Sequence, residues 1–201
     1  DDIQFCRYLP FLKAWGGNVV FITQQSLIPV MSTLFGVDQV CEFKPSTHEA
    51  LRKHPLFVPV MSLPRIFRTT LESIPNQTPY LSVPAAYREK WKTLLEPHKK
   101  EPCVKKIGLV YASANDKRDK NCPFSLWLPL FSLPGLQWYS IQKGEATAEM
   151  GNIAAIQDNF VDLSAHIQDF GDTAALLDQL DLLISIDTSV PHMAGALGKP
   201  V

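Results

Sequence analysis

The sequence is poor in the features that mark several specialised classes of protein. Only four of its 201 residues are cysteine, and their wide spacing fits neither a metal motif nor a redox pair, as expected in a reducing compartment. Acidic and basic residues nearly cancel, leaving a net charge of -1, so overall charge gives no indication of nucleic-acid binding. The longest apolar run, at 180–186, contains Asp181 and falls short of the ~20 apolar residues that cross a bilayer. We therefore expect a cytoplasmic protein without a transmembrane segment or a bound metal.

Familiar nucleotide and nucleophile motifs are also missing. The sequence contains no GxGxxG turn, no P-loop and no nucleophile elbow. Its 46% apolar and 19% charged residues are ordinary for a globular protein and exclude a disordered chain. Proline is frequent, with 16 residues against 10 glycines, which indicates many short loops. The chain opens on Asp1 and Asp2 without an initiator methionine, so we expect a piece of a longer protein.

Strand-like and helix-like segments alternate along most of the chain, a pattern typical of α/β proteins with parallel sheets. The expected helices are 3–15, 26–34, 48–54, 87–95, 123–131, 173–179 and 190–197, with Ser26 and Asp172 as N-caps. The expected strands are 18–22, 37–43, 56–61, 106–111, 137–142 and 182–186.

Two segments interrupt this alternation. Residues 62–84 are rich in proline and follow an expected strand, which makes them a candidate binding loop. Residues 96–102 are charged, contain two prolines and are the best candidate for a linker. We predict an N-terminal Rossmann-like domain at 1–96 that lacks its first strand, a linker at 97–105, and an incomplete C-terminal Rossmann-like domain at 106–201.

Charge is distributed unevenly despite the small total. Residues 97–120 hold seven basic and three acidic side chains, whereas 145–201 hold nine acidic and one basic. A basic segment on an acidic body could steer an anionic small molecule, or it could be a solvated linker.

The most informative segment follows the apolar strand expected at 182–186. Asp187, Thr188 and Ser189 come directly after it and precede a helix rich in small residues. The first-turn amides of such a helix lack intrahelical partners, and with the helix dipole they favour an anion such as a phosphate. His192, in that first turn, could donate to a phosphate or ribose oxygen. Helix capping and a solvent-exposed histidine would explain the same residues equally well.

Three further positions have both a functional and a plain explanation. Lys143 ends an expected strand and can reach a phosphate as a point charge, or it is an exposed lysine before a turn. Ser113 follows another strand among small residues that leave room for a ligand, or it lies in a solvated loop. Asp1 could act as a general base if it faced a cleft, or it could be a helix N-terminal acid that favours the dipole.

Several motifs occur in a fixed order along the chain. They are residues 4–10 (Gln-Phe-Cys-Arg-Tyr-Leu-Pro), 61–64 (Met-Ser-Leu-Pro), 69–71, 74–75, 79–81, 107–111, 142–144 (Gln-Lys-Gly), 169–176 and 187–192 (Asp-Thr-Ser-Val-Pro-His). In this combination nearly the whole chain resembles the glycosyltransferase domain that follows tetratricopeptide repeats in many bacterial proteins. That domain is related to the ADP-heptose:lipopolysaccharide heptosyltransferases of glycosyltransferase family 9.

The resemblance implies a GT-B architecture, in which two Rossmann-like domains flank a catalytic cleft and the second domain of this chain is truncated. The residues that it places at the donor diphosphate are Asp187, Thr188, Ser189 and His192, with Lys143, Ser113 and Lys120 nearby. The residues that it places on the acceptor side are Ser62, Pro64 and Thr69. Lys120 stands in a loop where relatives often carry Arg-Ser, and it would substitute for that pair.

The reaction implied by the resemblance is direct displacement. Asp1 would deprotonate an acceptor hydroxyl, which attacks the anomeric carbon of a nucleotide-diphosphate sugar. No metal or cofactor is implied, because helix amides and basic side chains can neutralise the leaving diphosphate. The implied partners are the sugar donor, an acceptor of glycan, lipid-linked or protein type, and N-terminal tetratricopeptide repeats. Two alternatives stay open: a non-catalytic binding or scaffold module on the same fold, and another nucleotide-sugar enzyme such as a hydrolase or epimerase.

Overall fold

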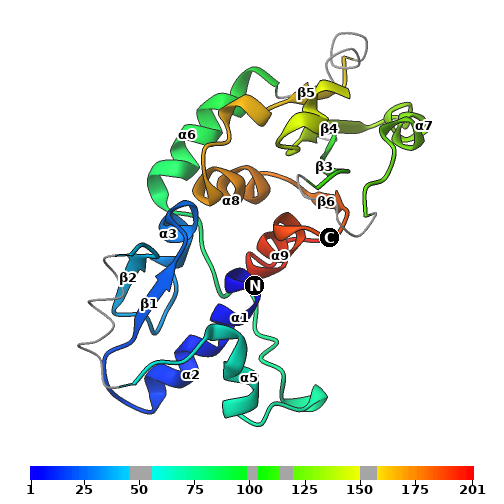
Figure 1. Cartoon of the computed structure of the whole chain (residues 1–201). Helices are drawn as coiled ribbons and strands as arrows, with labels where there is room; N and C mark the ends of the chain where they lie inside the picture. The colour runs from blue at the N-terminus through cyan, green and yellow to red at the C-terminus, as the bar shows by residue number, and fades with distance from the viewer. Residues whose placement is uncertain (46–55, 99–103, 114–119, 150–157) are drawn as a thin grey trace.

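The computed structural model describes residues 1–45, 56–98, 104–113, 120–149 and 158–201. Within them, two parallel sheets carry helices and short 3-10 turns, as Figure 1 shows. The N-terminal elements are α1 (Asp2–Phe5), η1 (Cys6–Tyr8), α2 (Leu9–Ala14), β1 (Val20–Thr23), η2 (Gln25–Leu27), α3 (Ile28–Met31) and β2 (Gln39–Glu42). β1 and β2 pair in parallel, with Val20 opposite Gln39.

The proline-rich segment and its continuation form short turns followed by one long helix. These elements are η3 (Val60–Ser62), α5 (Leu63–Ile66), η4 (Leu71–Ser73), α6 (Ala85–Leu95) and η5 (Glu96–His98). Backbone amides of Tyr80 and Leu81 donate to the carbonyl of Ala196 at 2.9 and 3.2 Å. The loop before α6 therefore contacts the C-terminal end of the last helix of the chain.

The second sheet has the strand order β5-β4-β3-β6, and every pairing is parallel. Its strands are β3 (Lys105–Val110), β4 (Leu136–Ser140), β5 (Phe160–Asp162) and β6 (Leu182–Ser185). The connecting elements are η6 (Phe124–Trp127), α7 (Leu128–Phe131), η7 (Glu145–Glu149), η8 (Ser164–His166) and α8 (Phe170–Asp178), and α9 (Ser189–Ala196) follows β6. This order, with the first strand of the unit between the second and the fourth, is that of a Rossmann half.

Two apolar clusters hold the described residues together. The larger cluster includes Ile3 of α1, Val30 of α3, Trp91 of α6, Leu176 of α8 and Met193 of α9, so it spans both sheets. The smaller cluster lies on the other face of the second sheet and is rich in aromatic side chains. Because the larger cluster contains residues of α1 and of α9, it holds these two helices against each other.

Helix α6 packs against α8, and a polar network accompanies the apolar contact. The hydroxyl of Tyr87 donates to Asp169 at 2.7 Å, and this hydrogen bond to a carboxylate raises the pKa of Tyr87 to about 12. Buried Asp172 accepts hydrogen bonds from Lys90 and from the indole of Trp91. The predicted boundaries at 1–96, 97–105 and 106–201 stay a prediction, but α6 contacts the second unit directly.

The expected fold class, an α/β protein with parallel sheets, is confirmed. Most expected elements occur within a few residues of their expected bounds. The first expected helix is divided into α1, η1 and α2, with Pro10 in the first turn of α2, where a missing N–H is harmless. Gly36, after α3, has a φ of +89° and lies so close to Pro10 that a Cβ would meet its Cα at 2.8 Å. Only glycine fits there, since both the backbone conformation and the space exclude a side chain.

Three expectations are corrected, one strand was not expected, and one expected helix lies where the structure describes nothing. No strand forms at 56–61, because Pro59 lacks a donor and leads into the turn η3. Strand β5 was not expected, since three residues are too short to show a periodicity. Ser26 is not an N-cap, and α8 is capped by Asp169, whose side chain accepts from the amide of Asp172 at 3.1 Å. The helix expected at 48–54 lies outside the described residues.

Candidate functional site

The loop between β6 and α9 presents the expected polar residues at a helix N-terminus. Thr188 is the N-cap, and its Oγ1 accepts from the amide of Val190 at 3.3 Å. Asp187, Ser189 and His192 are exposed, whereas the opposite side of α9 is buried against the core. The helix is therefore anchored through its apolar side, with its first turn open to a ligand.

Asp187, Lys120 and His192 form a charged cluster at this helix start. The ammonium of Lys120 donates to the Asp187 carboxylate and, at 3.3 Å, to the Asp187 carbonyl. Nε2 of His192 lies 3.7 Å from the same carboxylate. A bound diphosphate would compete with the Asp187 carboxylate for Lys120 and His192. Direct contact between the diphosphate and Asp187 would be unfavourable, because both are negatively charged. The cluster fits a role for Asp187 in positioning Lys120 and His192 better than a role in touching an anion.

Ser113 and Lys143 each lie three residues beyond the end of one of two neighbouring strands, β3 and β4. Lys143 is exposed, and its ammonium donates to the carbonyl of Ile167, before α8. The backbone amide of Ser113 donates to Asn121 Oδ1 at 2.7 Å, one residue from Lys120. Ser113 is thus connected with the segment of Lys120, whereas Lys143 is directed toward another segment.

Asp1 begins the chain next to the helix that carries the charged cluster. Its carbonyl accepts from the amides of Gln4 and Phe5 at 3.0 Å, and α1 packs against α9 (Figure 1). The side chain of Asp1 is exposed and makes no capping hydrogen bond. The expected base and the expected donor site therefore lie on two helices in contact with each other.

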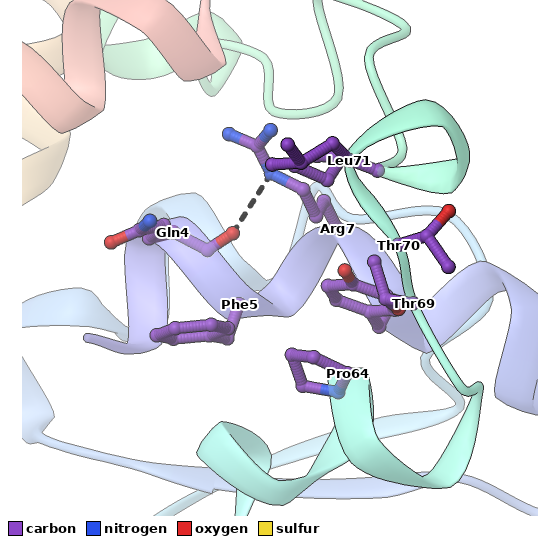
Figure 2. Close-up of a pocket in the computed structure, with 9 residues that line it drawn as sticks. Gln4, Phe5, Arg7, Pro64, Thr69, Thr70 and Leu71 are labelled. Carbon is purple, nitrogen blue, oxygen red and sulfur yellow. Dashed lines mark hydrogen bonds between the residues drawn. The ribbon is translucent and has the colours of Figure 1, made fainter.

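A pocket of about 460 Å³ lies beside α1 and η1 (Figure 2). Its lining comes from the first helix and from the proline-rich segment: Gln4, Phe5, Arg7, Tyr8, Pro64, Thr69, Thr70, Leu71 and Ile74. Pro64 and Thr69 were expected on the acceptor side, and both line this pocket. Ser62 does not line it and occupies the N-cap position of α5.

Three residues that sequence reasoning did not select support this geometry. Asp2 accepts from the hydroxyl of Thr23 at 2.6 Å, which ties α1 to the end of β1. The buried amide of Gln142 bonds the backbone of residues 111–112 and of Lys143, so it joins the loops after β3 and β4. Arg7 lines the pocket. Gln142 could have been selected from the sequence, since it is a polar residue at the end of a buried strand. Asp2 and Arg7 could not, because their hydrogen-bond partners are distant in sequence.

The described residues contain neither a metal-type cluster nor a membrane-spanning helix. No three His, Cys, Asp or Glu side chains of 1–45, 56–98, 104–113, 120–149 and 158–201 are grouped so that they could hold a metal ion. In the same part of the chain, no helix has both the length and the apolar character needed to cross a membrane.

Two solved structures illustrate the likeness of this fold to known proteins. A glycosyl transferase of family 9 from Veillonella parvula matches 98% of this chain and 75% of its own, with a TM-score of 0.73 and 13% identity. The ADP-heptose lipopolysaccharide heptosyltransferase II of E. coli matches 100% of this chain and 80% of its own, with a TM-score of 0.67 and 13% identity. The chain has a GT-B-type fold. At this identity, the likeness establishes the GT-B-type fold alone.

A comparison with curated proteins adds a relative of unstated function. Protein FlbA of Caulobacter vibrioides is 31% identical over 224 residues, an alignment that covers all of this chain and 37% of FlbA. The chain thus spans well under half the length of that relative. No protein-family profile matches the sequence. The expected tetratricopeptide repeats stay a prediction.

Proposed function

We propose that the chain is a glycosyltransferase module that moves a sugar from a nucleotide-diphosphate sugar to an acceptor hydroxyl by direct displacement. The observation that supports it best is the contact between α1, which begins after Asp1, and α9, which carries His192 in its first turn. This contact supports the proposal, because it joins the helix that follows the proposed base to the helix whose start would bind the diphosphate. The GT-B-type fold of family 9 structures agrees with this assignment.

In the proposed reaction, each group of residues has a separate task. Amides at the start of α9, with Ser189, Lys120 and His192, bind the donor diphosphate and stabilise the charge that grows as it leaves. Asp1 accepts the proton of the acceptor hydroxyl as its oxygen attacks the anomeric carbon. The new bond joins that oxygen to the sugar, while the bond from the sugar to the diphosphate breaks and its electron pair stays with the diphosphate. The reaction needs no metal or cofactor in this proposal.

The donor site is tested first by binding. ADP, GDP and UDP should each be added to the 201-residue chain, with adenosine, guanosine and uridine as matched controls without phosphate. A diphosphate that binds should raise the free energy of unfolding by RT ln(1 + [L]/Kd), about 2.7 kcal/mol at a concentration of 100 Kd. His192→Ala should weaken the binding of that diphosphate and leave the nucleoside control unchanged. A flat response to all three diphosphates would contradict the donor site.

The transfer reaction is tested with the full-length protein and with sugars linked to the nucleoside diphosphate that binds in the first test. Asp1→Asn should lower turnover by about 10²- to 10⁴-fold, the usual contribution of a positioned base, and leave diphosphate affinity unchanged. A wild-type protein that binds the diphosphate but forms no sugar product with any donor would instead support the scaffold alternative. Free sugar as the main product would indicate a hydrolase, and an altered nucleotide sugar an epimerase.

A further inference from the structure

Two glutamines of the second unit are almost completely buried, but their surroundings are opposite. Gln137, in β4, is 1% exposed, and neither its amide nitrogen nor its amide oxygen has a hydrogen-bond partner in the described residues. Gln142, two residues beyond the end of β4, is 2% exposed, and its amide makes four hydrogen bonds. Burying an amide costs free energy unless it is hydrogen-bonded. Gln142 therefore fixes the groups around it, whereas Gln137 fixes none.

The amide of Gln142 joins β3 and β4 at the point where their backbone pairing ends. Among the described residues, this pairing ends with the hydrogen bond from the amide of Ile141 to the carbonyl of Leu109 at 3.1 Å. Beyond it, Oε1 of Gln142 accepts from the amides of Tyr111 and Ala112 at 3.1 and 3.0 Å. Nε2 donates to the carbonyls of Ala112 and of residue 143, at 2.9 Å each. Both donors and both lone pairs of this amide are thus used.

The backbone that Gln142 holds is tied in turn to a stretch farther along the chain. The amide of Cys122 donates to the carbonyl of Tyr111 at 3.0 Å. The amide of Ser113 donates to the side-chain oxygen of Asn121 at 2.7 Å. These two hydrogen bonds fix the stretch that ends at Cys122 relative to the end of β3, and therefore relative to Gln142.

Lys120 belongs to this fixed stretch and reaches the segment after β6, where it donates to the carboxylate of Asp187. In the sheet, β3 lies between β4 and β6, so the order of the strands reverses at β3 (Figure 1). Ligands of open α/β sheets bind outside the carboxyl ends of the strands at such a reversal. By holding the end of β3 against the end of β4, Gln142 determines where Lys120 lies at the start of α9.

We propose that Gln142 is a positioning residue of the donor-diphosphate site, and that its four hydrogen bonds place Lys120 against the start of α9. In this proposal Gln142 touches neither the diphosphate nor Lys120, and it acts through the backbone of residues 111–113. The inference rests on the proposed function, since the position of Lys120 affects a reaction only if a diphosphate binds there. The placement of the backbone itself does not rest on that function and can be measured without a ligand.

Gln142→Met and Gln137→Met form a matched pair, because each replaces a buried amide on the same side of the molecule's second sheet by an apolar side chain of similar length. The Kd of the nucleoside diphosphate that stabilises the wild type is measured by titration calorimetry on the 201-residue chain. Gln142→Met should raise this Kd about tenfold, the factor expected for loss of the Lys120 ammonium. Gln137→Met should leave it unchanged. A Kd that Gln142→Met does not raise, or that both variants raise equally, would overturn the proposal.

The double variant Gln142→Met with Lys120→Met separates positioning from a merely structural role. If Gln142 acts through Lys120, the double variant should bind the diphosphate as Lys120→Met does, because the ammonium that Gln142 positions is already absent. Effects that multiply in the double variant would overturn the proposal. If Gln142→Met does not fold, Gln142→Asn replaces it throughout, since its amide is one methylene too short for all four partners. The expected rise in Kd is then about threefold.

Hydrogen exchange of the Cys122 amide tests the placement without a ligand. This amide bonds to the carbonyl of Tyr111, which Gln142 holds, so its exchange should be about tenfold faster in Gln142→Met and unchanged in Gln137→Met. The amide of Leu109, in the central strand β3, is the reference for global unfolding.

The two measurements distinguish failure of this inference from failure of the proposed function. If no diphosphate binds the wild type but the Cys122 amide responds as expected, the proposed function fails and the placement by Gln142 stands. If a diphosphate binds and Gln142→Met changes neither its Kd nor the exchange of this amide, this inference alone fails. A Cys122 amide that does not respond would overturn the inference with or without a bound diphosphate.

Discussion

Two aspartates in this molecule have similar local chemistry and opposite surroundings. Asp172 lies in the first turn of α8 and accepts from Lys90 at 2.6 Å. Asp187 lies just before α9 and accepts from Lys120. Both carboxylates thus pair with a lysine from another segment at the start of a helix.

Burial separates their roles. The Asp172 side chain is 1% exposed and also accepts from the Trp91 indole at 2.8 Å and the Gln168 amide at 2.9 Å, whereas the Asp187 side chain is 65% exposed. A buried carboxylate with three donors contributes to stability, because its removal would leave those donors without an acceptor. An exposed ion pair contributes little to stability but stays available to a ligand. The same pair of residue types therefore joins α6 to α8 in one place and forms a candidate binding cluster in the other.

Loss of Asp172 should give the largest effect on stability. Asp172→Ala leaves the Trp91 indole and the Gln168 amide without their acceptor, and we expect the free energy of unfolding to fall by about 3 kcal/mol. Asp187→Ala is the matched control and should change it by about 0.5 kcal/mol or less. Urea unfolding of the three proteins measures both values. Equal losses in the two variants would show that burial does not separate the two aspartates.

The lysine partners of the two aspartates, Lys120 and Lys90, should differ in their effect on diphosphate binding rather than on stability. Lys120→Met removes one donor from the proposed diphosphate site, and we expect the Kd of the bound nucleoside diphosphate to rise about tenfold, equivalent to about 1.4 kcal/mol. Lys90→Met removes the same charge from the α6–α8 contact and should leave that Kd unchanged. Titration calorimetry with the diphosphate that stabilises the wild type provides the measurement. A Kd that is unaffected by Lys120→Met would remove Lys120 from the donor site.

The sequence predicted those parts of the molecule whose signals are local. β6 and α9 were expected because an apolar run, a capping pair and a helical run of small residues lie within 16 residues of each other. The polar residues between them were expected for the same reason. The fold class followed from the alternation of such local signals, and it is confirmed.

What could not be predicted depends on contacts between distant residues. The pocket brings Gln4 and Arg7 together with Thr69 and Leu71, more than 60 positions away, and no spacing rule connects the two segments. The error at α8 has the same origin: Asp172 was the expected cap, but its carboxylate accepts from the indole of Trp91 and the ammonium of Lys90, and Asp169 caps the helix instead. Hydrogen bonds to distant residues thus keep Asp172 from the capping role that its position in the sequence indicated.

The smallest expected effect is the pH dependence of the Asp172 contribution. Burial raises the pKa of Asp172, but hydrogen bonds from Lys90, the Gln168 amide and Trp91, together with the Lys90 charge, outweigh it and leave the net pKa below the ordinary value of 3.8. The folded state then binds this proton less readily than the unfolded state, so stability is present above the ordinary pKa and is lost as the pH falls through the folded pKa.

Urea unfolding of the wild type and of Asp172→Asn from about pH 6 to about pH 3 isolates this contribution. Asp38 and Asp181 also have lowered pKa values, Asp38 chiefly through a hydrogen bond from Lys13 and Asp181 chiefly through one from the Lys106 amide, so both proteins should lose some stability in acid. The wild type should lose more, and the difference between the two proteins should narrow as the pH falls. Parallel curves would mean that Asp172 holds its hydrogen bonds without a shifted pKa, and the contrast with exposed Asp187 would then rest on burial alone.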